Sequence, residues 1–376
     1  MMDPVPHAYA ARLRALRAEP SRDVAGDPAR LRRVTLTREE MLSQEAAIGA
    51  TLTAEAAALA AIGAMARARR VDHVVVLGCG DSWFVGMGVR HAFERLTGRP
   101  MIAAQALDYA AFDHAGTGPG GLVMGISAGG NTPVVMDALR AARQRGAMTV
   151  GISNTAGAPL LTEFDGGLRV HATRRGWPTQ SSTATMALLV ALGLAIAGDV
   201  PGRAAIATAL DAAPGHGRRT LEMADAPMAA LAAALADARE IFLAGAGPHH
   251  ATACFGAAKI RELSPVHATA FALEELHHYR LPKRGDALIL VAPDAASRPR
   301  ALDTAIVGMA EGAQVHALLA DADPELEALL AGHVRVAASD AALAPIVHAP
   351  ALHAFAYHFA MSREARGLGR PGEARA

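Results

Sequence analysis

Cysteine and lysine are both scarce in this chain of 376 residues. Cysteine occurs only as Cys79 and Cys254, which excludes a disulfide framework and suits a reducing compartment, so the cytoplasm is the expected location. Among 36 basic residues only Lys259 and Lys283 are lysine, and the rest are arginine. Against that background, a lysine beside a glutamate is a candidate for a role that needs a compact, titratable ammonium.

Long apolar runs and an excess of either charge are also missing. The longest apolar run, residues 186–197, is shorter than the roughly 20 residues that cross a bilayer, so it predicts a buried helix. Residues 1–20 have no long apolar core and do not resemble a secretory signal. Basic and acidic residues both number 36, which disfavours nucleic acid or an anionic membrane as a partner. A small molecule is the expected partner.

From residue 73 onward the pattern alternates between apolar strands and helices. Strands are predicted at 73–78, 100–106, 121–127, 147–153 and 167–172, and then at 239–245, 286–293, 314–320 and 333–338. The first and second groups both begin with an apolar strand, Gly-x-Gly and a helix. This repetition predicts an α/β fold of two tandem domains, each with a doubly wound parallel sheet.

The expected domain boundaries follow from that repeat. Residues 1–60 are predicted to be an N-terminal helical arm, 61–215 the first domain and 220–376 the second. A stretch rich in glycine and proline, residues 199–219, is predicted to connect the domains. Within the arm, Thr37 and Glu40 have the spacing of a capping box that would open a helix.

Polar groups gather in one short stretch of the second domain. Lys259 and Glu262 share a helical face, so the ammonium could hold the carboxylate ionised and make Glu262 a candidate general base. The helix is predicted to end at Ser264, with 266–271 as a short crossing segment, after which a turn could carry His278 back toward Glu262. The alternative is an exposed helix with an ordinary surface ion pair.

A second candidate site lies at residues 125–135, GISAGGNTPVV. A buried strand ends at Ser127, a flexible loop follows, and Thr132 is predicted to cap a helix that begins with Pro133. Free backbone N–H groups and the helix dipole at such a point favour a phosphate. A tight turn with nothing bound is the alternative. For the hydroxyl cluster TQSSTAT at 179–185, ligand binding and ordinary capping are both open.

Other chemistries have weaker support. Gly78 and Gly80 begin a dinucleotide motif with Asp108 as the ribose acid, but the third glycine is missing. Cys79 stands at a helix start without a sequence partner that would make it a nucleophile. The histidines at 249–250, 267 and 277–278 lack the spacing of a zinc site. No metal and no cofactor are therefore expected.

Taken in domain order, these motifs resemble the tandem sugar isomerase (SIS) domain family, which includes the isomerase half of glucosamine-6-phosphate synthase, glucosamine-6-phosphate deaminases and fructosamine-phosphate deglycases. The matching stretches are CGDS at 79–82, ISAGGNT at 126–132, SSTAT at 181–185, Lys259-x-x-Glu262 with His278 sixteen residues on, and AYHFA at 356–360. The resemblance covers about residues 40–370. It implies two flavodoxin-like domains and a homodimer whose site lies between repeats and subunits.

The resemblance also implies roles. Glu262 would move a proton between sugar C1 and C2 beside Lys259, and His278 would assist ring opening. The implied substrate-binding residues are Cys79, Gly80, Asp81, Ser82, Ser127, Gly129, Asn131, Thr132, Ser181, Ser182 and Thr183. The implied function is a phosphosugar isomerase or an aminosugar-phosphate deaminase acting on a sugar 6-phosphate. A sugar-phosphate-binding regulator without turnover is the alternative; no helix-turn-helix segment supports a version that binds DNA.

The chain departs from the family pattern at several points. Ala128 and Gly129 stand where the phosphate loop commonly has glutamine and serine, and Ala184 replaces a lysine. Asp81 replaces a threonine common in the synthases. For the family's C-terminal lysine the chain offers at best Arg375. No glutaminase domain or leading nucleophilic cysteine is visible, so glutamine-dependent synthesis is disfavoured.

Overall fold

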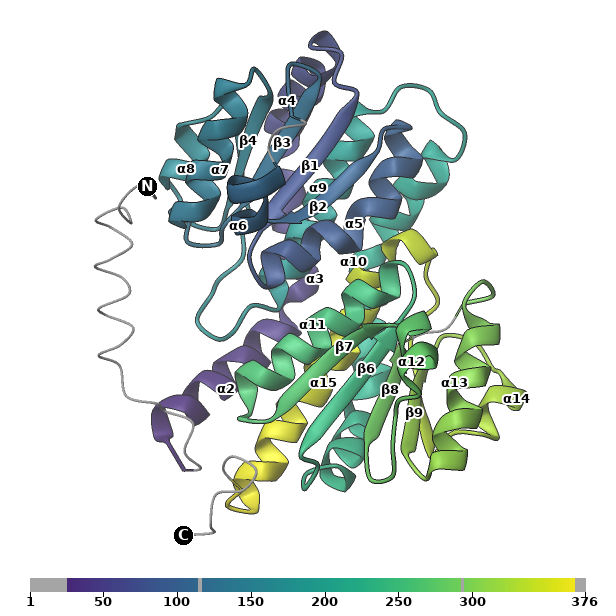
Figure 1. Cartoon of the computed structure of the whole chain (residues 1–376). Helices are drawn as coiled ribbons and strands as arrows, with labels where there is room; N and C mark the ends of the chain where they lie inside the picture. Colours follow the sequence, from purple (N-terminus) through teal and green to yellow (C-terminus); the bar gives the residue numbers. More distant parts are fainter. Residues whose placement is uncertain (1–25, 114–116, 292–293, 369–376) are drawn as a thin grey trace.

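Two parallel five-stranded sheets form the frame of the protein (Figure 1), in a computed structural model that describes residues 26–113, 117–291 and 294–368. The first sheet has the order β2-β1-β3-β4-β5. Its strands are β1 His73–Gly78, β2 Met101–Gln105, β3 Gly121–Ile126, β4 Met148–Ser153 and β5 Gly166–Arg169. The second sheet has the order β10-β9-β8-β6-β7. Its strands are β6 Glu240–Gly245, β7 His267–Ala272, β8 Ala287–Val291, β9 Gln314–Leu319 and β10 Gly332–Arg335.

Both sheets share one topology. Counted from the first strand of each unit, each order is 2-1-3-4-5, the flavodoxin-like arrangement, which confirms the predicted α/β class. Strands of this kind are buried on both faces, so neighbouring residues serve different cores. In β1, Val74 and Val76 belong to one apolar cluster, while Val75 and Leu77 belong to another.

Helices cover both faces of each sheet (Figure 1). Around the first sheet they are α3 Gln44–Ala54, α4 Ala56–Ala68, α5 Asp81–Thr97, α6 Ala106–Asp108, α7 Pro133–Gln144, α8 Pro159–Thr162 and α9 Gln180–Ile196. Around the second they are α2 Pro28–Leu42, α10 Arg203–Ala234, α11 Pro248–Leu263, α12 Leu273–Tyr279, α13 Arg298–Glu311, α14 Pro324–Glu327 and α15 Ala344–Ala365. A π-helical turn, Tyr109–Asp113, and a 3-10 turn, Ala341–Leu343, complete the elements.

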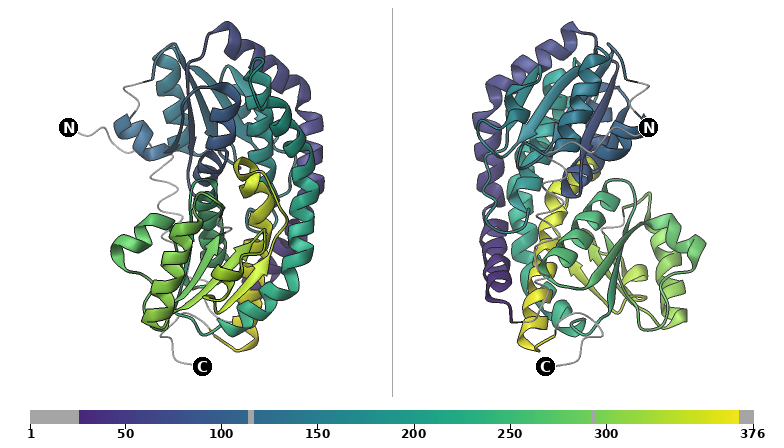
Figure 2. Two further views of the ribbon diagram at one scale, coloured as in Figure 1. Left: turned by 90° about the vertical axis from the view of Figure 1, so that its right-hand side faces the viewer. Right: turned by 60° about the vertical axis from the view of Figure 1, so that its left-hand side comes forward.

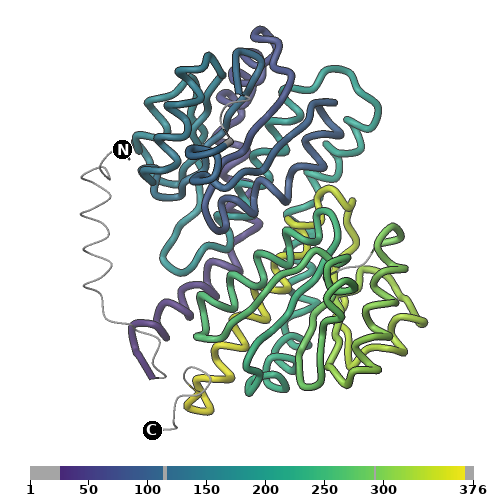
Figure 3. The backbone as a smooth tube through the Cα atoms, in the orientation of Figure 1, coloured from purple at the N-terminus to yellow at the C-terminus, as the bar shows by residue number. Residues whose placement is uncertain are grey.

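The N-terminal helices pack on both units. Val34 and Met41 of α2 belong to the core of the second unit, whereas Ile48, Leu59 and Ile62 of α3 and α4 belong to the core of the first. The backbone tube shows α2 beside the second unit, from where the chain passes to the first unit and returns through α10 (Figure 3). Helices α2 to α4 and α10 therefore run along one side of both units (Figure 2).

The connection predicted at residues 199–219 is mostly part of α10, a helix of 32 residues. Pro214 lies inside that stretch and favoured the prediction of a connection, since proline removes a helical hydrogen bond; the helix also contains Pro227, beyond the stretch. Burial of residues such as Leu210 and Leu221 against neighbouring helices outweighs that cost. The break expected between residues 215 and 220 falls inside this helix, and the domain bounds stay a prediction.

Two further local predictions are wrong. The segment expected to cross at 266–271 is β7, an edge strand paired with β6; it is half exposed and therefore lacks a continuous apolar run. The capping box does not open a helix, because α2 begins after Asp27, whose side chain accepts a hydrogen bond from the N–H of Ala29. Thr37 and Glu40 lie in mid-helix.

Glu40 has another structural role. Its buried carboxylate accepts hydrogen bonds from the Thr173 hydroxyl at 2.6 Å and from the N–H groups of Arg175 at 2.8 Å and Gly176 at 3.1 Å. Thr37 Oγ1 accepts a hydrogen bond from the N–H of Trp177. Together they hold the loop that leads into α9, so this pair positions the hydroxyl cluster at the start of that helix.

Within the described ranges, no single helix is long and apolar enough to cross a membrane; α3 and α4 reach that length and apolarity only when taken together, with a bend of 59° between them.

Candidate functional site

The carboxyl edge of the first sheet brings several predicted site residues together. Strand β1 ends at Gly78, and Gly80, with φ +55°, turns the chain into α5, which begins with Asp81 and Ser82. Strand β3, next to β1, ends just before Ser127. In open parallel sheets, ligands bind at this edge, beside the point where strand order reverses.

Helix α11 of the second unit presents Lys259 to this edge. Its Phe255 belongs to the core of the first unit and meets Phe84 of α5 edge to face, with ring centroids 5.9 Å apart. Lys259 is fully buried, and its Nζ lies 2.7 Å from Asp81 Oδ2 and also contacts Glu262 Oε2. We call Asp81, Lys259 and Glu262 the ion triad. The burial of the lysine excludes the alternative of an ordinary surface pair.

Burial and charge set the protonation of the ion triad. Burial by itself lowers the pKa of Lys259, but the two carboxylates outweigh it and raise that pKa above its ordinary value. Burial raises the pKa of Glu262, against the attraction of Lys259, and the charge of Asp81 raises it further. About 32% of the Glu262 side chain is exposed. Glu262 is therefore a reachable carboxylate with a raised pKa, which suits a general base.

His353 is a neighbour of the ion triad that the sequence analysis missed. It lies on α15, is fully buried, and neither ring nitrogen has a hydrogen-bond partner among the residues that the structure describes. Burial, with the nearby charge of Lys259, lowers the pKa of His353 to about 3. The neutral ring adds no second positive charge beside the lysine. Its sequence signal is a histidine in the mostly apolar first half of α15.

The loop after β3 has its hydroxyls joined. Ser127 Oγ lies 2.7 Å from Thr132 Oγ1 and accepts a hydrogen bond from the N–H of Gly130 at 3.1 Å. Gly130 has φ +72°, and an added Cβ would come within 2.3 Å of the Ala158 Cβ, so only glycine fits. Thr132 precedes α7 as predicted, but its side chain makes no capping hydrogen bond.

This loop keeps backbone donors available. Across the described residues, no partner is found for the N–H groups of Ala128, Gly129 and Asn131. An added Cβ at Gly129 would meet only the Asn131 Oδ1, at 3.4 Å. Because α7 begins here with Pro133, free N–H groups and a helix dipole act at the same place. The geometry fits an anion.

Two hydroxyls of the cluster at the start of α9 donate hydrogen bonds to different partners. Ser181, Ser182 and Thr183 are all buried. Ser182 Oγ donates to Asp81 Oδ2 at 3.3 Å, whereas Thr183 Oγ1 donates to Gln44 Oε1 at 3.1 Å on α3. Ser182 therefore adjoins the ion triad, and the Thr183 hydroxyl is taken up by the packing of α9 on α3.

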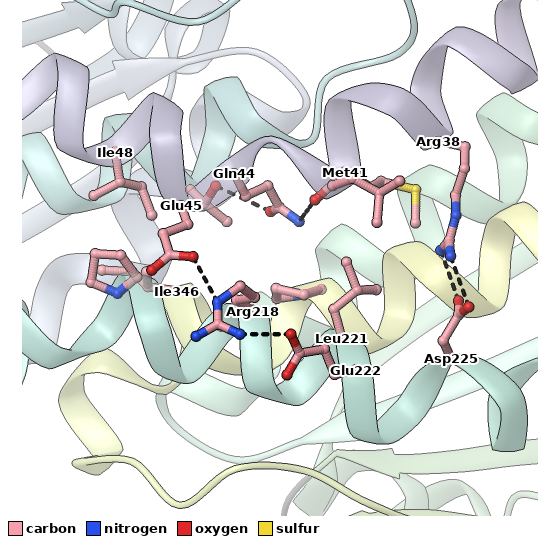
Figure 4. Close-up of a pocket in the computed structure, with 15 residues that line it drawn as sticks. Arg38, Met41, Gln44, Glu45, Ile48, Arg218, Leu221, Glu222, Asp225 and Ile346 are labelled. Atoms are coloured by element: carbon pink, nitrogen blue, oxygen red, sulfur yellow. Dashed lines mark hydrogen bonds and ion pairs between the residues drawn. The ribbon is translucent and has the colours of Figure 1, made fainter.

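Thr183 also lines a cavity of about 380 Å³ between the N-terminal helices and α10 (Figure 4). Ion pairs border this cavity, including Arg38 with Asp225 and Arg218 with Glu45. Thr183 is the single predicted site residue among those that line it. The cavity is therefore separate from the ion triad.

Two predicted residues contribute less than expected. Cys79 is half buried, its Sγ is 3.9 Å from Gln105 Nε2, and burial raises the pKa of its thiol, which disfavours a nucleophile. His278 lies on α12, beyond the end of β7 opposite to Glu262. A strand of six residues spans about 20 Å, so the structure does not bring these two side chains together. His278 is exposed, with Nε2 3.7 Å from Glu274 Oε1.

In the part of the chain that the structure describes, no group of three histidine, cysteine, aspartate or glutamate side chains is placed to hold a metal ion. Arg375 lies outside the described residues.

Buried histidines predict a stability that depends on pH. Burial lowers the pKa of His348 to about 4 and that of His353 to about 3, against 6.5 for an ordinary histidine. Below about pH 6.5 these histidines therefore bind protons in the unfolded chain but not in the folded chain, so the free energy of unfolding falls as pH falls. Each of these two histidines should lower the free energy of unfolding by about 2 kcal/mol when the pH is lowered from 7 to 5.

Urea unfolding at both pH values checks this expectation. His353→Leu should remove about 2 kcal/mol of the pH dependence. The exposed His278→Leu should leave the pH dependence as in the wild type, and an equal pH dependence in all three proteins would contradict the prediction.

Comparisons with known proteins agree with the fold and the first unit. A family model described as the SIS domain matches residues 69–195. The glutamine–fructose-6-phosphate aminotransferase (isomerizing) of Streptomyces coelicolor is 30% identical over 315 residues, which cover 78% of this chain and 50% of that protein. An aminotransferase of the same description from Rattus norvegicus is 30% identical over 217 residues, 56% of this chain and 31% of that protein. The chain spans half or less of these curated relatives.

Solved structures share the whole arrangement at low identity. The C-terminal domain of glucosamine-fructose-6-phosphate aminotransferase from Francisella tularensis has a TM-score of 0.75 and 20% identity, over 87% of this chain and 96% of that chain. Glucosamine-6-phosphate deaminase from Thermotoga maritima has a TM-score of 0.65 and 18% identity, over 93% and 99%. These two likenesses establish the fold. The family match, which is confined to residues 69–195, shows an SIS domain in the first unit.

Proposed function

We propose that the protein is a phosphosugar isomerase or an aminosugar-phosphate deaminase that transfers a proton between C1 and C2 of a sugar 6-phosphate. The observation that carries the proposal is the ion triad, in which a fully buried lysine holds the raised-pKa carboxylate of Glu262 at the edge that also bears the Ser127–Thr132 loop. The family match and the names of the relatives support a sugar phosphate as substrate.

In this proposal, phosphate binding, proton transfer and charge stabilisation are carried out by different groups of the site. The phosphate would occupy the loop between Ser127 and Thr132, where backbone N–H groups are free. Glu262 would take the proton from one sugar carbon as the electrons of that C–H bond form the C=C bond of an enediolate, and would return it to the neighbouring carbon while a proton passes between the two sugar oxygens. The Lys259 ammonium would stabilise charge on the sugar oxygens, and Asp81, with Ser182, would hold the lysine in place.

The wider organisation is part of the same proposal. The second unit, with its matching strand order, would be a second SIS domain, and residues 1–60 a helical arm. The protein would act in the cytoplasm as a homodimer with sites between repeats and subunits, without cofactor, metal or nucleic acid. The exposed His278 would assist ring opening only in such an assembly, since within one chain it lies far from Glu262.

A regulator that binds a sugar phosphate without turnover is the second candidate. Two features favour it: Ala128 and Ala184 bring no side-chain donor where the family commonly has glutamine and lysine. Incubation with hexose and hexosamine 6-phosphates, with ketose and ammonia measured separately, separates the candidates. Turnover of one sugar would establish an enzyme, and ammonia release would identify a deaminase. Binding of a sugar phosphate without formation of ketose or ammonia would support the regulator instead of the enzyme.

The phosphate loop gives a prediction of its own. Thr132→Val removes the hydroxyl that pairs with Ser127, so the loop loses a donor and its hydroxyl pair. In thermal unfolding, the wild type should be stabilised more by glucose 6-phosphate than by glucose, because a bound ligand raises stability with its affinity. Thr132→Val should shrink that difference. Thr162→Val, at an exposed position of α8, should keep it. Equal stabilisation of the wild type by both compounds would contradict the prediction that this loop binds the phosphate group.

A further inference from the structure

The second unit repeats the backbone geometry that opens the first site. Gly247 follows β6 with φ +53° and ψ −126°, and Gly80 follows β1 with φ +55° and ψ −129°. Helix α11 begins after Gly247 as α5 begins after Gly80. A cavity of about 430 Å³ lies at this edge, between the starts of α11 and α13 and the end of β9. Its volume is typical of small-molecule pockets, which have about 300–1,000 Å³.

Two buried histidines line this cavity with unused hydrogen-bonding capacity. His249 and His348 are 3% and 2% exposed, and their rings stack with centroids 5.7 Å apart and an interplanar angle of 11°. His348 Nε2 lies 3.0 Å from the Ala337 carbonyl oxygen, which only accepts, so Nε2 carries the proton. The Nδ1 atoms of both rings are buried, and neither has a partner within residues 26–113, 117–291 and 294–368.

These rings are acceptors at neutral pH. Burial lowers the pKa of His348 to about 4, and burial also lowers the pKa of His249 despite the attraction of Asp294. Both imidazoles are therefore uncharged near pH 7, and the free Nδ1 of His348 can only accept a hydrogen bond. Buried polar atoms are nearly always paired, so a ligand whose hydroxyl groups reach these nitrogen atoms would complete their hydrogen bonding.

The charges around the cavity favour a cation over an anion. Three carboxylates line it, those of Asp294, Asp321 and Asp323, with one guanidinium, that of Arg298. Arg298 is already held by Asp323, with Nε–Oδ2 at 2.5 Å and Nη2–Oδ1 at 2.8 Å, and by Glu325 at 2.7 Å. Among the described lining residues no positive charge is left for a phosphate.

We propose that this cavity binds a second ligand, an amino sugar or similar polyhydroxyl ammonium compound without phosphate. The histidine rings accept hydrogen bonds from its hydroxyls, and Asp294 faces its ammonium group. Asp294 is held in place by Ser297, whose N–H and hydroxyl donate to its Oδ1 at 2.9 and 2.8 Å. This site lies on the second sheet, apart from the Ser127–Thr132 loop, and goes beyond the proposed reaction.

Calorimetric titration of the full chain tests the proposal with glucosamine, glucose and glucose 6-phosphate as probes. Glucosamine should bind more tightly than glucose. Asp294→Asn keeps the shape and the Ser297 contacts but removes the charge, so glucosamine affinity should fall by about tenfold or more while glucose affinity changes little. His249→Phe should weaken both sugars. The matched controls Asp286→Asn, in another turn, and His316→Phe, at a buried histidine outside the cavity, should bind as the wild type does.

Other results would contradict this proposal, reassign the ligand or separate it from the proposed reaction. If glucosamine binds no more tightly than glucose, the charge argument is wrong. If glucosamine affinity is unchanged in both Asp294→Asn and His249→Phe, both the charge argument and the histidine argument are wrong. Loss of glucosamine binding in Thr132→Val would assign it to the first site instead. A chain with no turnover on any sugar phosphate that still binds glucosamine through Asp294 would refute the proposed reaction and leave this site standing.

Discussion

Lys259→Met should lower the free energy of unfolding by about 3–5 kcal/mol, because it leaves the carboxylates of Asp81 and Glu262 without their cation. Removing one partner of a buried ion pair costs far more than removing a surface pair, which contributes about 0–1 kcal/mol. Lys259 is fully buried, and its ion pair with Asp81 is one of the contacts that join α11 of the second unit to α5 of the first. Urea unfolding at pH 7 measures the loss.

The chain offers a matched control in its other lysine. Lys283 is exposed, so Lys283→Met should change stability by about 0.5 kcal/mol or less. If the unpaired carboxylates cause the loss, combining Lys259→Met with Asp81→Asn and Glu262→Gln should recover a large part of it, since no buried charge is then left alone. A loss below about 1 kcal/mol for Lys259→Met would show that the triad is weakly coupled to the fold.

Glu262→Gln should reduce turnover of the sugar phosphate by about 10²–10⁴-fold while leaving its binding largely intact. Glutamine keeps the size of the side chain but cannot accept the proton. Lys259 keeps its 2.7 Å pairing with Asp81 in this variant, so the fold should hold. Kinetics on the substrate found in the panel, together with thermal shift by glucose 6-phosphate, separate lost chemistry from lost binding.

Glu275 supplies the comparison for this variant. It lies in the first turn of α12, on the far side of β7 from the ion triad. Glu275→Gln should keep turnover within a few-fold of the wild type. Turnover near the wild-type level in Glu262→Gln, with a large loss in Glu275→Gln, would reassign the general base.

The sequence by itself determined the class of fold and singled out the motifs of the candidate site. Its apolar runs predicted nine of the ten strands in the described residues, because buried parallel strands read as continuous apolar segments. The missed strand, β7, is a half-exposed edge strand without that signal. The scarcity of lysine singled out Lys259, and the loop motif singled out Ser127 and Thr132, since both signals are local in the chain.

Tertiary structure alone decided which of these groups meet. Asp81 and Lys259 are 178 positions apart, and only the packing of α11 on α5 makes them partners. No sequence pattern predicted His353 beside Lys259 either, because its place depends on how α15 is buried. The same packing keeps His278 away from Glu262: β7 separates them, although they are only sixteen residues apart in the sequence. Spacing predicts neighbours along one element, whereas contacts between elements depend on burial of their apolar faces.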